Sequence, residues 1–345
     1  MNLLRNEIID MTFSPETYTQ RRQKLMSQMD SGLIFLLGND NVGMSYADNH
    51  YPFFRQDSTF LYYIGIDLPG IAAIMDVDSG ETILFGEDVS IDSMVWTGPL
   101  PSLDELTQGV GIEFHETPDK ISEHLQKARS LNRKIHFLPP YRGRLSIQYA
   151  ALLGLAQNVI STSASTQLIQ SIIKQRSIKT AEEIEQLEQA VRLTNRMHLK
   201  AMEVAKPGMK EAEVMAQVFA VAHTADSHPS FPIILSIHGE ILHNHHHHHT
   251  LTEDRLLLVD CGGESPMHYA GDMTRTFPVA AKFTPRHKDV YEVALASQLA
   301  AIDALKPGVM YKDIHVLAGE KIAEGLTDLG IMKGNPEEAV AAGAH

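Results

Sequence analysis

The pattern of apolar and polar positions divides the chain into two segments of different texture. In the first segment, short apolar runs bounded by Gly, Pro, Asn and Asp predict strands, and stretches with apolar residues at helical spacing predict helices. The expected strands are 32–38, 71–75, 82–85 and 134–138, and the expected helices are 15–29, 118–131 and 144–156. The turn Asp-Val-Asp-Ser-Gly at 76–80 predicts that the second and third strands form a hairpin. Residues 1–172 are therefore predicted to form an α/β domain.

The second segment, residues 173–345, carries longer helical patterns and a repeated unit. Thr180 and Glu183 form a capping pattern at the start of a helix that continues to about Val204. The tripeptide Lys-Pro-Gly follows this helix at 206–208 and recurs at 306–308, and a further helix follows each copy. We interpret the recurrence as two related halves; the alternative is the chance recurrence of a helix-breaking tripeptide.

Strand patterns lie between the two copies of this unit. They are expected at 233–237, 255–260 and 268–277, and their Gly- and Pro-rich connections favour antiparallel pairing. The second domain is therefore predicted to be α+β, with an antiparallel sheet covered by helices.

Charge and cysteine content narrow the partners and the compartment. The net charge of -14 argues against a nucleic-acid partner, because phosphate binding needs clustered Lys and Arg. The single cysteine, Cys261, cannot form an internal disulfide, and residues 1–10 carry charges where the apolar core of a signal peptide would run. Every apolar run is shorter than the ~18 residues needed to cross a bilayer. We therefore expect a cytoplasmic protein that binds neither nucleic acid nor membrane.

Two aspartates in the second domain are the leading candidates for chemistry. Asp260 ends the apolar strand 256–259, where an acidic residue is costly unless it is paired or binds a cation. Asp272 lies in the next strand, and its distance along the chain from Pro266 equals that of Asp260, which predicts that the two aspartates face each other across a hairpin. Carboxylates held so close repel each other unless cations lie between them, so the spacing favours a metal site.

Two other interpretations of this pair remain open from the spacing. In one, Asp260 caps a turn and Asp272 is merely exposed to solvent. In the other, the two carboxylates are the acid and the base of a glycosidase, although neither has a feature that marks it as the acid. The sequence carries no Walker loop, dinucleotide glycine fingerprint, nucleophile elbow or zinc-binding His-Glu-x-x-His, so no other catalytic motif competes strongly.

Histidines upstream of this pair form a second candidate group. His243 follows an apolar strand, and a histidine there can transfer protons at neutral pH, although an isolated histidine is more often structural. The run His245–His249 is expected to be a polar loop that chelates metal adventitiously rather than a physiological ligand set.

Three stretches of the second domain form a specific signature. They are Ile-Leu-His at 241–243, Leu-Val-Asp-Cys-Gly-Gly-Glu at 258–264 and Tyr-Ala-Gly-Asp-Met-Thr-Arg-Thr-Phe-Pro at 269–278. With the segment 176–180, they resemble the catalytic domain of the pita-bread metallopeptidases, and most closely that of the aminopeptidase P (Xaa-Pro aminopeptidase) family. Segments 51–58 and 60–65 resemble the signature of that family's N-terminal domain, so the resemblance covers nearly the whole chain.

The resemblance implies a hydrolase that removes the N-terminal residue from peptides with proline in second position. It also implies two divalent metal ions, usually Mn²⁺, with Zn²⁺ or Co²⁺ as alternatives, held by two Asp, one His and two Glu. Asp260 and Asp272 match the two Asp positions, and His243 matches the histidine that contacts substrate and assists proton transfer.

The resemblance also bears on assembly, and a homodimer or homotetramer is expected. In this family the N-terminal domain often contributes oligomer contacts and can place an aromatic residue near a neighbouring active site. Trp96 resembles that position, and the alternative is a partly buried Trp that closes the core of the first domain.

The chain departs from the family pattern at its C-terminal end. The family's metal-binding His, within a His-Gly-Leu-x-His stretch, and its two Glu ligands are not present in residues 1–345, and His345 falls ahead of that stretch. We therefore expect a pita-bread domain whose C-terminal part is missing, and a 345-residue chain that holds metal weakly and does not turn over substrate. An Xaa-Pro dipeptidase (prolidase) and a non-catalytic pita-bread module that binds peptides or proteins remain the alternatives.

Overall fold

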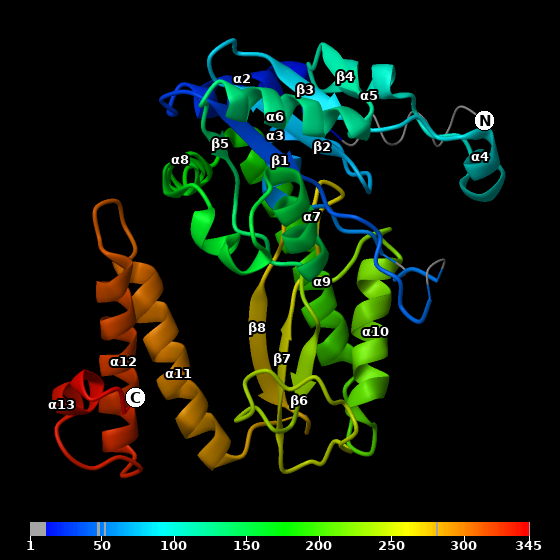
Figure 1. Ribbon diagram of the computed structural model, residues 1–345. Helices are drawn as coiled ribbons and strands as arrows, with labels where there is room; N and C mark the ends of the chain where they lie inside the picture. Colours follow the sequence, from blue (N-terminus) through cyan, green and yellow to red (C-terminus); the bar gives the residue numbers. More distant parts are fainter. Residues whose placement is uncertain (1–11, 47–48, 52, 281, 345) are drawn as a thin grey trace. The chain divides into compact units, whose positions relative to one another are not determined.

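The computed structural model describes residues 12–46, 49–51, 53–280 and 282–344 (Figure 1). The chain forms two compact units. Unit 1 comprises residues 1–186 and 266–268, and unit 2 comprises residues 187–265 and 269–345. The chain passes from unit 1 to unit 2 within a long helix, α9 (Ala181–Val204).

Unit 1 is built on a five-stranded mixed sheet with the strand order β4-β3-β2-β1-β5. Its strands are β1 (Leu33–Leu37), β2 (Ala72–Asp76), β3 (Thr82–Phe85), β4 (Phe114–Glu116) and β5 (Ile135–His136). β1 and β3 each pair antiparallel with β2, whereas β1 pairs parallel with β5 and β3 pairs parallel with β4. The predicted hairpin is therefore confirmed as β2 and β3, and the last predicted strand shrinks to two residues.

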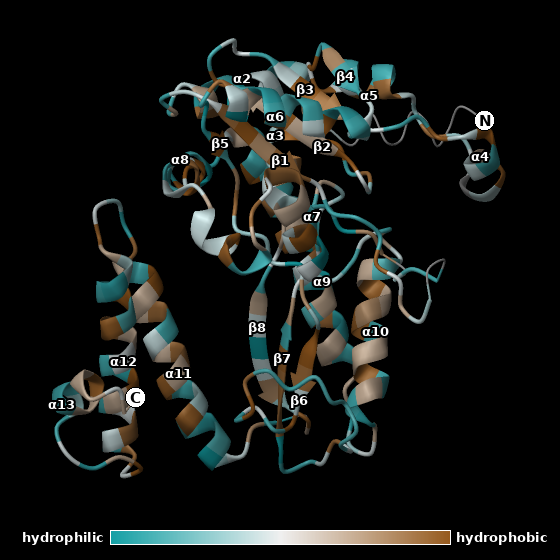
Figure 2. Cartoon of the chain, viewed as in Figure 1, coloured by the Kyte–Doolittle hydropathy of each residue, from teal (hydrophilic) through white to brown (hydrophobic). Residues whose placement is uncertain are grey.

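Both faces of this sheet are buried, because successive side chains of a strand point to opposite sides. Ile34 and Leu36 of β1 belong to one core, with side chains from α2, α3, α5 and α8, whereas Leu33 and Phe35 belong to the other, with side chains from α6 and α7. These helices are α2 (Pro15–Met26), α3 (Ser58–Ile64), α5 (Leu103–Gly109), α6 (Ile121–Ser130), α7 (Gly143–Leu153) and α8 (Thr166–Arg176). Figure 2 shows β1 as a continuous hydrophobic strand. The predicted α/β class of the first domain is confirmed.

One further helix of unit 1, α4 (Ile91–Thr97), exposes apolar side chains. Trp96 is 87% exposed, so the alternative that this residue closes the core of the first domain is wrong.

Unit 2 is built on a three-stranded antiparallel sheet, formed by β6 (Ile234–Ser236), β7 (Leu256–Cys261) and β8 (Met273–Pro278) in that order. Leu257 and Val259 of β7 are buried against side chains of α9 and of α10 (Glu211–His223). Three more helices follow, α11 (Pro285–Ala304), α12 (Tyr311–Asp328) and α13 (Pro336–Ala341). The predicted antiparallel sheet covered by helices is confirmed.

The repeated Lys-Pro-Gly tripeptide occupies the same structural position twice. It joins α9 to α10 and α11 to α12, and Gly208 and Gly308 adopt φ angles of +89° and +92°. Backbone with such angles strains side chains other than glycine's, so the same turn ends both helices. This agreement favours two related halves over chance recurrence.

Within the part of the chain that the structure describes, no helix is both long enough and apolar enough to cross a membrane.

Candidate metal centre

The hairpin of β7 and β8 carries both candidate aspartates. Asp260 pairs with Thr274 on β8 and with Ile234 on β6, so it lies on the central strand of the sheet. Asp272 immediately precedes β8, and the pairing of Glu264 with Ala270 continues the same register on its other side. Residues two apart on a strand point to the same face, so Asp260 and Asp272 are diagonal neighbours.

The prediction that the two aspartates lie directly opposite each other is therefore wrong by two residues. The turn is centred on Met267 rather than on Pro266, as the pairings Glu264 with Ala270 and Asp260 with Thr274 require. A shift of the centre by one residue moves each partner by two, which preserves the face that a side chain occupies. Thr274 and Thr276 of β8, which pair with Asp260 and Leu258, consequently lie on the same sheet face as Asp260.

The environment of Asp260 fits a cation. Leu257, Val259 and Cys261 of β7 are buried in the core, whereas Asp260 is half-buried on the opposite face. Its Oδ1 atom is shielded from solvent and has no hydrogen-bond partner among the residues that the structure describes. An anionic oxygen in this state is strongly disfavoured unless a positive charge or a donor reaches it. Asp272, by contrast, is exposed.

The neighbouring thiol responds to both carboxylates. Burial raises the pKa of Cys261 to about 12, and the negative charges of Asp260 and Asp272 add to the effect. The thiol of Cys261 is therefore protonated at neutral pH. This response places both carboxylates within electrostatic reach of one side chain.

Two glycines let the backbone approach closely beside the aspartates. A Cβ atom on Gly262 would overlap the carbonyl oxygen of Gly271, and one on Gly271 would overlap Oγ1 of Thr194. The close approach allows two hydrogen bonds: Gly271 N donates to Gly263 O at 2.9 Å, and Ser230 Oγ donates to Gly271 O at 2.8 Å. The glycines of the Cys-Gly-Gly and Ala-Gly-Asp motifs thus fix the position from which Asp272 projects.

A histidine that was not predicted from the sequence to belong to the site binds the backbone of β8. His198 of α9 donates from Nε2 to the Met273 carbonyl oxygen at 2.8 Å, and the same atom lies 3.5 Å from Sγ of Cys261. Burial lowers the pKa of His198, which favours the neutral ring. A signal was available, because Ala190, Thr194 and His198 share one helical face that also carries apolar core residues.

His243 lies in the segment between β6 and β7, and its side chain is exposed. Within the described residues, no hydrogen bond or ion pair joins it to Asp260 or Asp272, and no three His, Cys, Asp or Glu side chains gather closely enough to hold a metal ion. The hairpin therefore brings together the two predicted Asp ligands.

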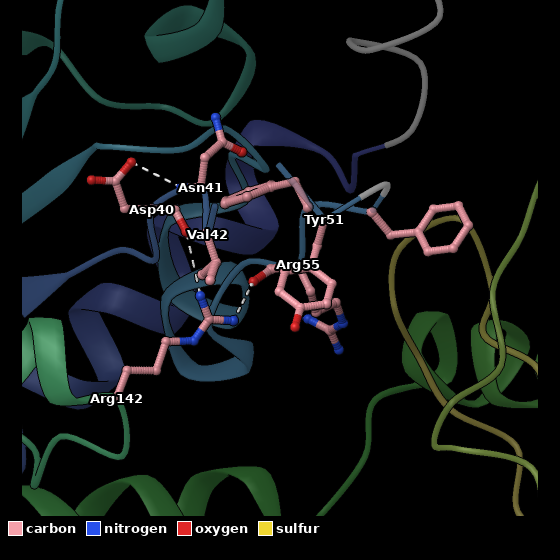
Figure 3. A pocket seen from close by; sticks show the side chains of 8 residues that line it. Asp40, Asn41, Val42, Tyr51, Arg55 and Arg142 are labelled. Carbon is pink, nitrogen blue, oxygen red and sulfur yellow. Dashed lines mark hydrogen bonds between the residues drawn. The ribbon is translucent and has the colours of Figure 1, made fainter. Parts of the chain in front are cut away.

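Unit 1 contains a pocket of about 360 Å³ (Figure 3). It is lined by Asp40, Asn41, Val42, Tyr51, Phe53, Phe54, Arg55 and Arg142. Arg142 donates to the carbonyl oxygens of Asp40 and Arg55, each at 3.4 Å, and the Asp40 carboxylate pairs with Arg144 at 2.6 Å. Asp40, the acidic member of this described lining, is thus already paired with an arginine, which leaves the hairpin of unit 2 as the better candidate for metal chemistry.

Comparison with known proteins agrees with this geometry. Residues 185–339 match metallopeptidase family M24, and residues 18–136 match the N-terminal domain of aminopeptidase P. The two matches together span most of the chain, and residues 185–339 form an M24 metallopeptidase domain. The M24 match spans the hairpin and both copies of the Lys-Pro-Gly turn, and membership of this family implies divalent metal ions.

Several relatives that match most of the chain are Xaa-Pro aminopeptidases. The Xaa-Pro aminopeptidase of Escherichia coli K12 is 28% identical over 96% of the chain and 77% of its own length, and that of Haemophilus influenzae is 29% identical over 96% and 76%. A probable Xaa-Pro aminopeptidase of Fusarium vanettenii is 29% identical, and the chain spans 65% of its length. The human Xaa-Pro dipeptidase is 27% identical over 94% of the chain and 68% of its own length.

Solved structures show the same fold. A variant of Escherichia coli aminopeptidase P in complex with substrate has a TM-score of 0.84 at 25% identity, covering 97% of this chain and 78% of that one. Proline aminopeptidase P II from Yersinia pestis has a TM-score of 0.84 at 27% identity, with 96% and 78% covered. The expected relationship to aminopeptidase P, the pita-bread fold and the class of metallo-exopeptidase are confirmed, and the prolidase alternative has less support.

Proposed function

We propose that this M24 metallopeptidase is an Xaa-Pro aminopeptidase that acts on peptides with proline in second position. The observation that carries the proposal is the shielded Oδ1 of Asp260, which finds no hydrogen-bond partner in the described part of the chain, on a side chain that shares its sheet face with Asp272. Asp260 and Asp272 would hold the metal. When bound, two divalent ions, for which we propose Mn²⁺ rather than Zn²⁺ or Co²⁺, supply Lewis-acid activation of the scissile carbonyl.

His243 is proposed to contact the substrate and to carry a proton to the leaving nitrogen of proline. The imidazole is exposed, so a substrate can reach it, and an imidazole ring can both accept and donate a proton. The two carboxylates would thus bind the metal, and the imidazole would transfer the proton.

Assembly and location form part of the same proposal. We propose domains at 1–172 and 173–345, a cytoplasmic location, and a homodimer or homotetramer that binds neither nucleic acid nor membrane. The exposed side chains of Ile91, Val95 and Trp96 in α4, each at least 78% exposed, support a contact between copies of the chain.

The substrate and the ligands are tested together on the complete protein supplied with Mn²⁺. We expect hydrolysis of an Xaa-Pro-Yaa tripeptide, and much slower hydrolysis of the Xaa-Pro dipeptide that a prolidase prefers. Asp260→Asn is expected to lower kcat/KM by at least roughly 100-fold, since loss of a partner behind a metal ligand already costs about 10- to 100-fold. Metal content is measured in the same samples.

Asp254→Asn is the matched control, because Asp254 lies on the same segment but is exposed, and its carboxylate accepts a hydrogen bond from its neighbour Thr252. It is expected to leave metal content and kcat/KM unchanged. Full metal content and full activity in Asp260→Asn would overturn the ligand assignment, and a preference for the dipeptide would favour the prolidase.

A further inference from the structure

A buried carboxylate outside the candidate metal centre makes an unusual set of contacts. Glu211 is the first residue of α10, and its side chain is fully buried. Its Oε1 accepts hydrogen bonds from Ser236 Oγ at 3.0 Å and from Ile237 N at 2.8 Å. Its Oε2 accepts from the backbone N of His249 at 3.3 Å and from Nδ1 of the same residue at 3.0 Å. One carboxylate therefore ties residue 237 to residue 249.

These two residues are the ends of the segment that carries His243. Residues 237–249 connect β6 to the approach of β7, and the structure gives this stretch no regular strand or helix. Loops of this kind are mobile unless their backbone is fastened. The Glu211 carboxylate closes the segment into a loop, which we call the His243 loop, by holding both of its ends.

The His243 loop is also fastened at its middle. Ser236 Oγ, which donates to Glu211, accepts hydrogen bonds from Asn244 Nδ2 at 3.1 Å and from His238 N at 3.0 Å. Asn244 is 5% exposed, and its Oδ1 accepts from His246 N at 3.0 Å. The chain of contacts from Glu211 through Ser236 thus ends on the residue that directly follows His243.

Helix capping does not explain the burial of Glu211. Glu213, two residues later, performs the capping: its exposed carboxylate accepts from Lys210 N at 2.7 Å. A fully buried carboxylate is costly, and charge-assisted bonds to several donors offset that cost. All four donors to Glu211 belong to Ser236 or to the two ends of the His243 loop.

We propose that Glu211 is the positioning residue for His243, acting through Ser236 and Asn244. The inference rests on the proposed function, because it assumes that His243 serves the reaction. A proton-transfer group must be held within a fraction of an ångström of its productive position, and supporting residues such as these supply that precision.

Order in the loop is tested first, by hydrogen exchange on the complete protein. Glu211→Gln keeps the shape but replaces one acceptor oxygen with an amide that cannot accept. Of the amides of Ile237 and His249, which bond different oxygens of Glu211, the one that faces the new amide group loses its buried acceptor and is expected to exchange at least ~10-fold faster, whereas those of Leu257 and Val259 in β7 stay protected. Glu213→Gln, the matched control on the same helix turn, is expected to leave the loop unchanged.

Function is tested by a double-mutant cycle with His243→Ala, on the tripeptide substrate. Glu211→Gln alone is expected to lower kcat by roughly 10- to 100-fold, as displacement of a catalytic group does. In the His243→Ala background it is expected to change kcat by less than about 2-fold, because a positioning residue has nothing left to position. A merely structural role would give the same fold-change in both backgrounds.

The outcomes separate the inference from the proposed function. Loss of activity in His243→Ala with unchanged exchange and kcat in Glu211→Gln would overturn the positioning role alone. Full activity in His243→Ala would overturn the role of His243 and the inference with it. Should Glu211→Gln fail to fold, Ser236→Ala cuts the same chain of contacts without exposing the carboxylate to a new donor, and it is expected to show the same dependence on His243.

Discussion

At the scale of single residues, small side chains beside the aspartates matter as much as the carboxylates themselves. Gly271 precedes Asp272, and a Cβ atom at this position would overlap Oγ1 of Thr194 and crowd the Ala190 carbonyl of α9. Any side chain at 271 would have to push the strand away from the helix. The geometry of the candidate metal centre therefore depends on the absence of a methyl group.

Gly271→Ala is expected to destabilise unit 2 by about 1–3 kcal/mol, the usual cost of forcing one extra carbon into a packed interior. Its Cβ would lie 2.8 Å from the Ala190 carbonyl oxygen, which is backbone and cannot swing aside. Denaturant unfolding followed by circular dichroism measures the loss. Gly143→Ala, where a Cβ meets nothing within 4 Å, is the control and is expected to be neutral or slightly stabilising. Equal stability of the two variants would contradict the crowding.

Asp260 could be predicted from the sequence, whereas Glu211 could not. The apolar run before Asp260 signals a strand that ends on a costly charge, and both features lie within a few residues of each other. Glu211 looks like an ordinary acidic residue in the first turn of a helix. Its partners lie 25 to 38 residues away, and no local pattern records such contacts.

At the scale of elements, the β2–β3 hairpin is held by one arginine. Arg133 donates from Nη1 to Asp76 Oδ2 and from Nε to Asp78 Oδ2, each at 2.9 Å. Burial alone would raise the pKa of Asp76, but hydrogen bonds from Arg133 and from backbone N–H groups outweigh it and lower the pKa. Arg133 thus stabilises the turn that the sequence predicted, through charged hydrogen bonds to both aspartates.

These hydrogen bonds make the stability of unit 1 depend on pH in the acid range. A carboxyl whose pKa is lowered on folding contributes stability above its ordinary pKa of 3.8 and loses it as pH falls through the folded value. Arg133→Gln is expected to cost about 1–2 kcal/mol near pH 7 and progressively less below pH ~4, as Asp76 becomes protonated. Thermal unfolding at a series of pH values measures the difference. A cost that does not change with pH would show that the arginine acts only through packing.

The exact register of the β7–β8 hairpin could not be predicted from the sequence. Hydrophobic alternation fixed which residues face the core, and it did so correctly for Leu257 and Val259. It could not fix the centre of the turn, because His268 adopts a φ of +62° there, a left-handed conformation unusual for a residue other than glycine. The pairing of Asp260 with Thr274 rather than with Asp272 follows from that turn.

At the scale of the whole molecule, the two units differ in their response to alkali. Tyr18, Tyr62, Tyr63 and Tyr149 all lie in unit 1, and burial raises the pKa of each above the ordinary value of 10.0. Burial also lowers the pKa of Arg22 to about 10, an opposing effect from a single group. The four tyrosines outnumber it, and they also outnumber the buried thiol of Cys261 in unit 2, whose raised pKa acts in the same direction as theirs.

Unit 1 is therefore expected to unfold before unit 2 as the pH rises above about 10. The folded tyrosines keep their protons to higher pH than the unfolded ones, so the free energy of unfolding falls as pH rises from 10. Segment-resolved hydrogen exchange between pH 9 and 11.5, corrected for the intrinsic rate, measures the order. Earlier loss of protection in β7 than in β1 would contradict the prediction.

The sequence predicted the classes of both domains and the repeated helical turn, since these depend on periodicity and on helix-breaking residues. It did not predict that residues 266–268 belong to unit 1. Within that unit, His268 Nε2 lies 2.8 Å from Asp67 Oδ2, and its carbonyl oxygen accepts from Arg55. These contacts join residues about 200 positions apart, beyond the reach of any pattern along the chain.

Because residues 266–268 of unit 1 interrupt the sequence of unit 2, the two units are difficult to separate or to exchange. No single cut of the gene separates the two units cleanly, because a fragment that starts at residue 187 takes His268 away from Asp67 and Arg55. An N-terminal half borrowed from another peptidase would have to bring its own counterparts of those two residues. The two halves of the gene are therefore expected to be inherited together, even though each encodes a core of its own.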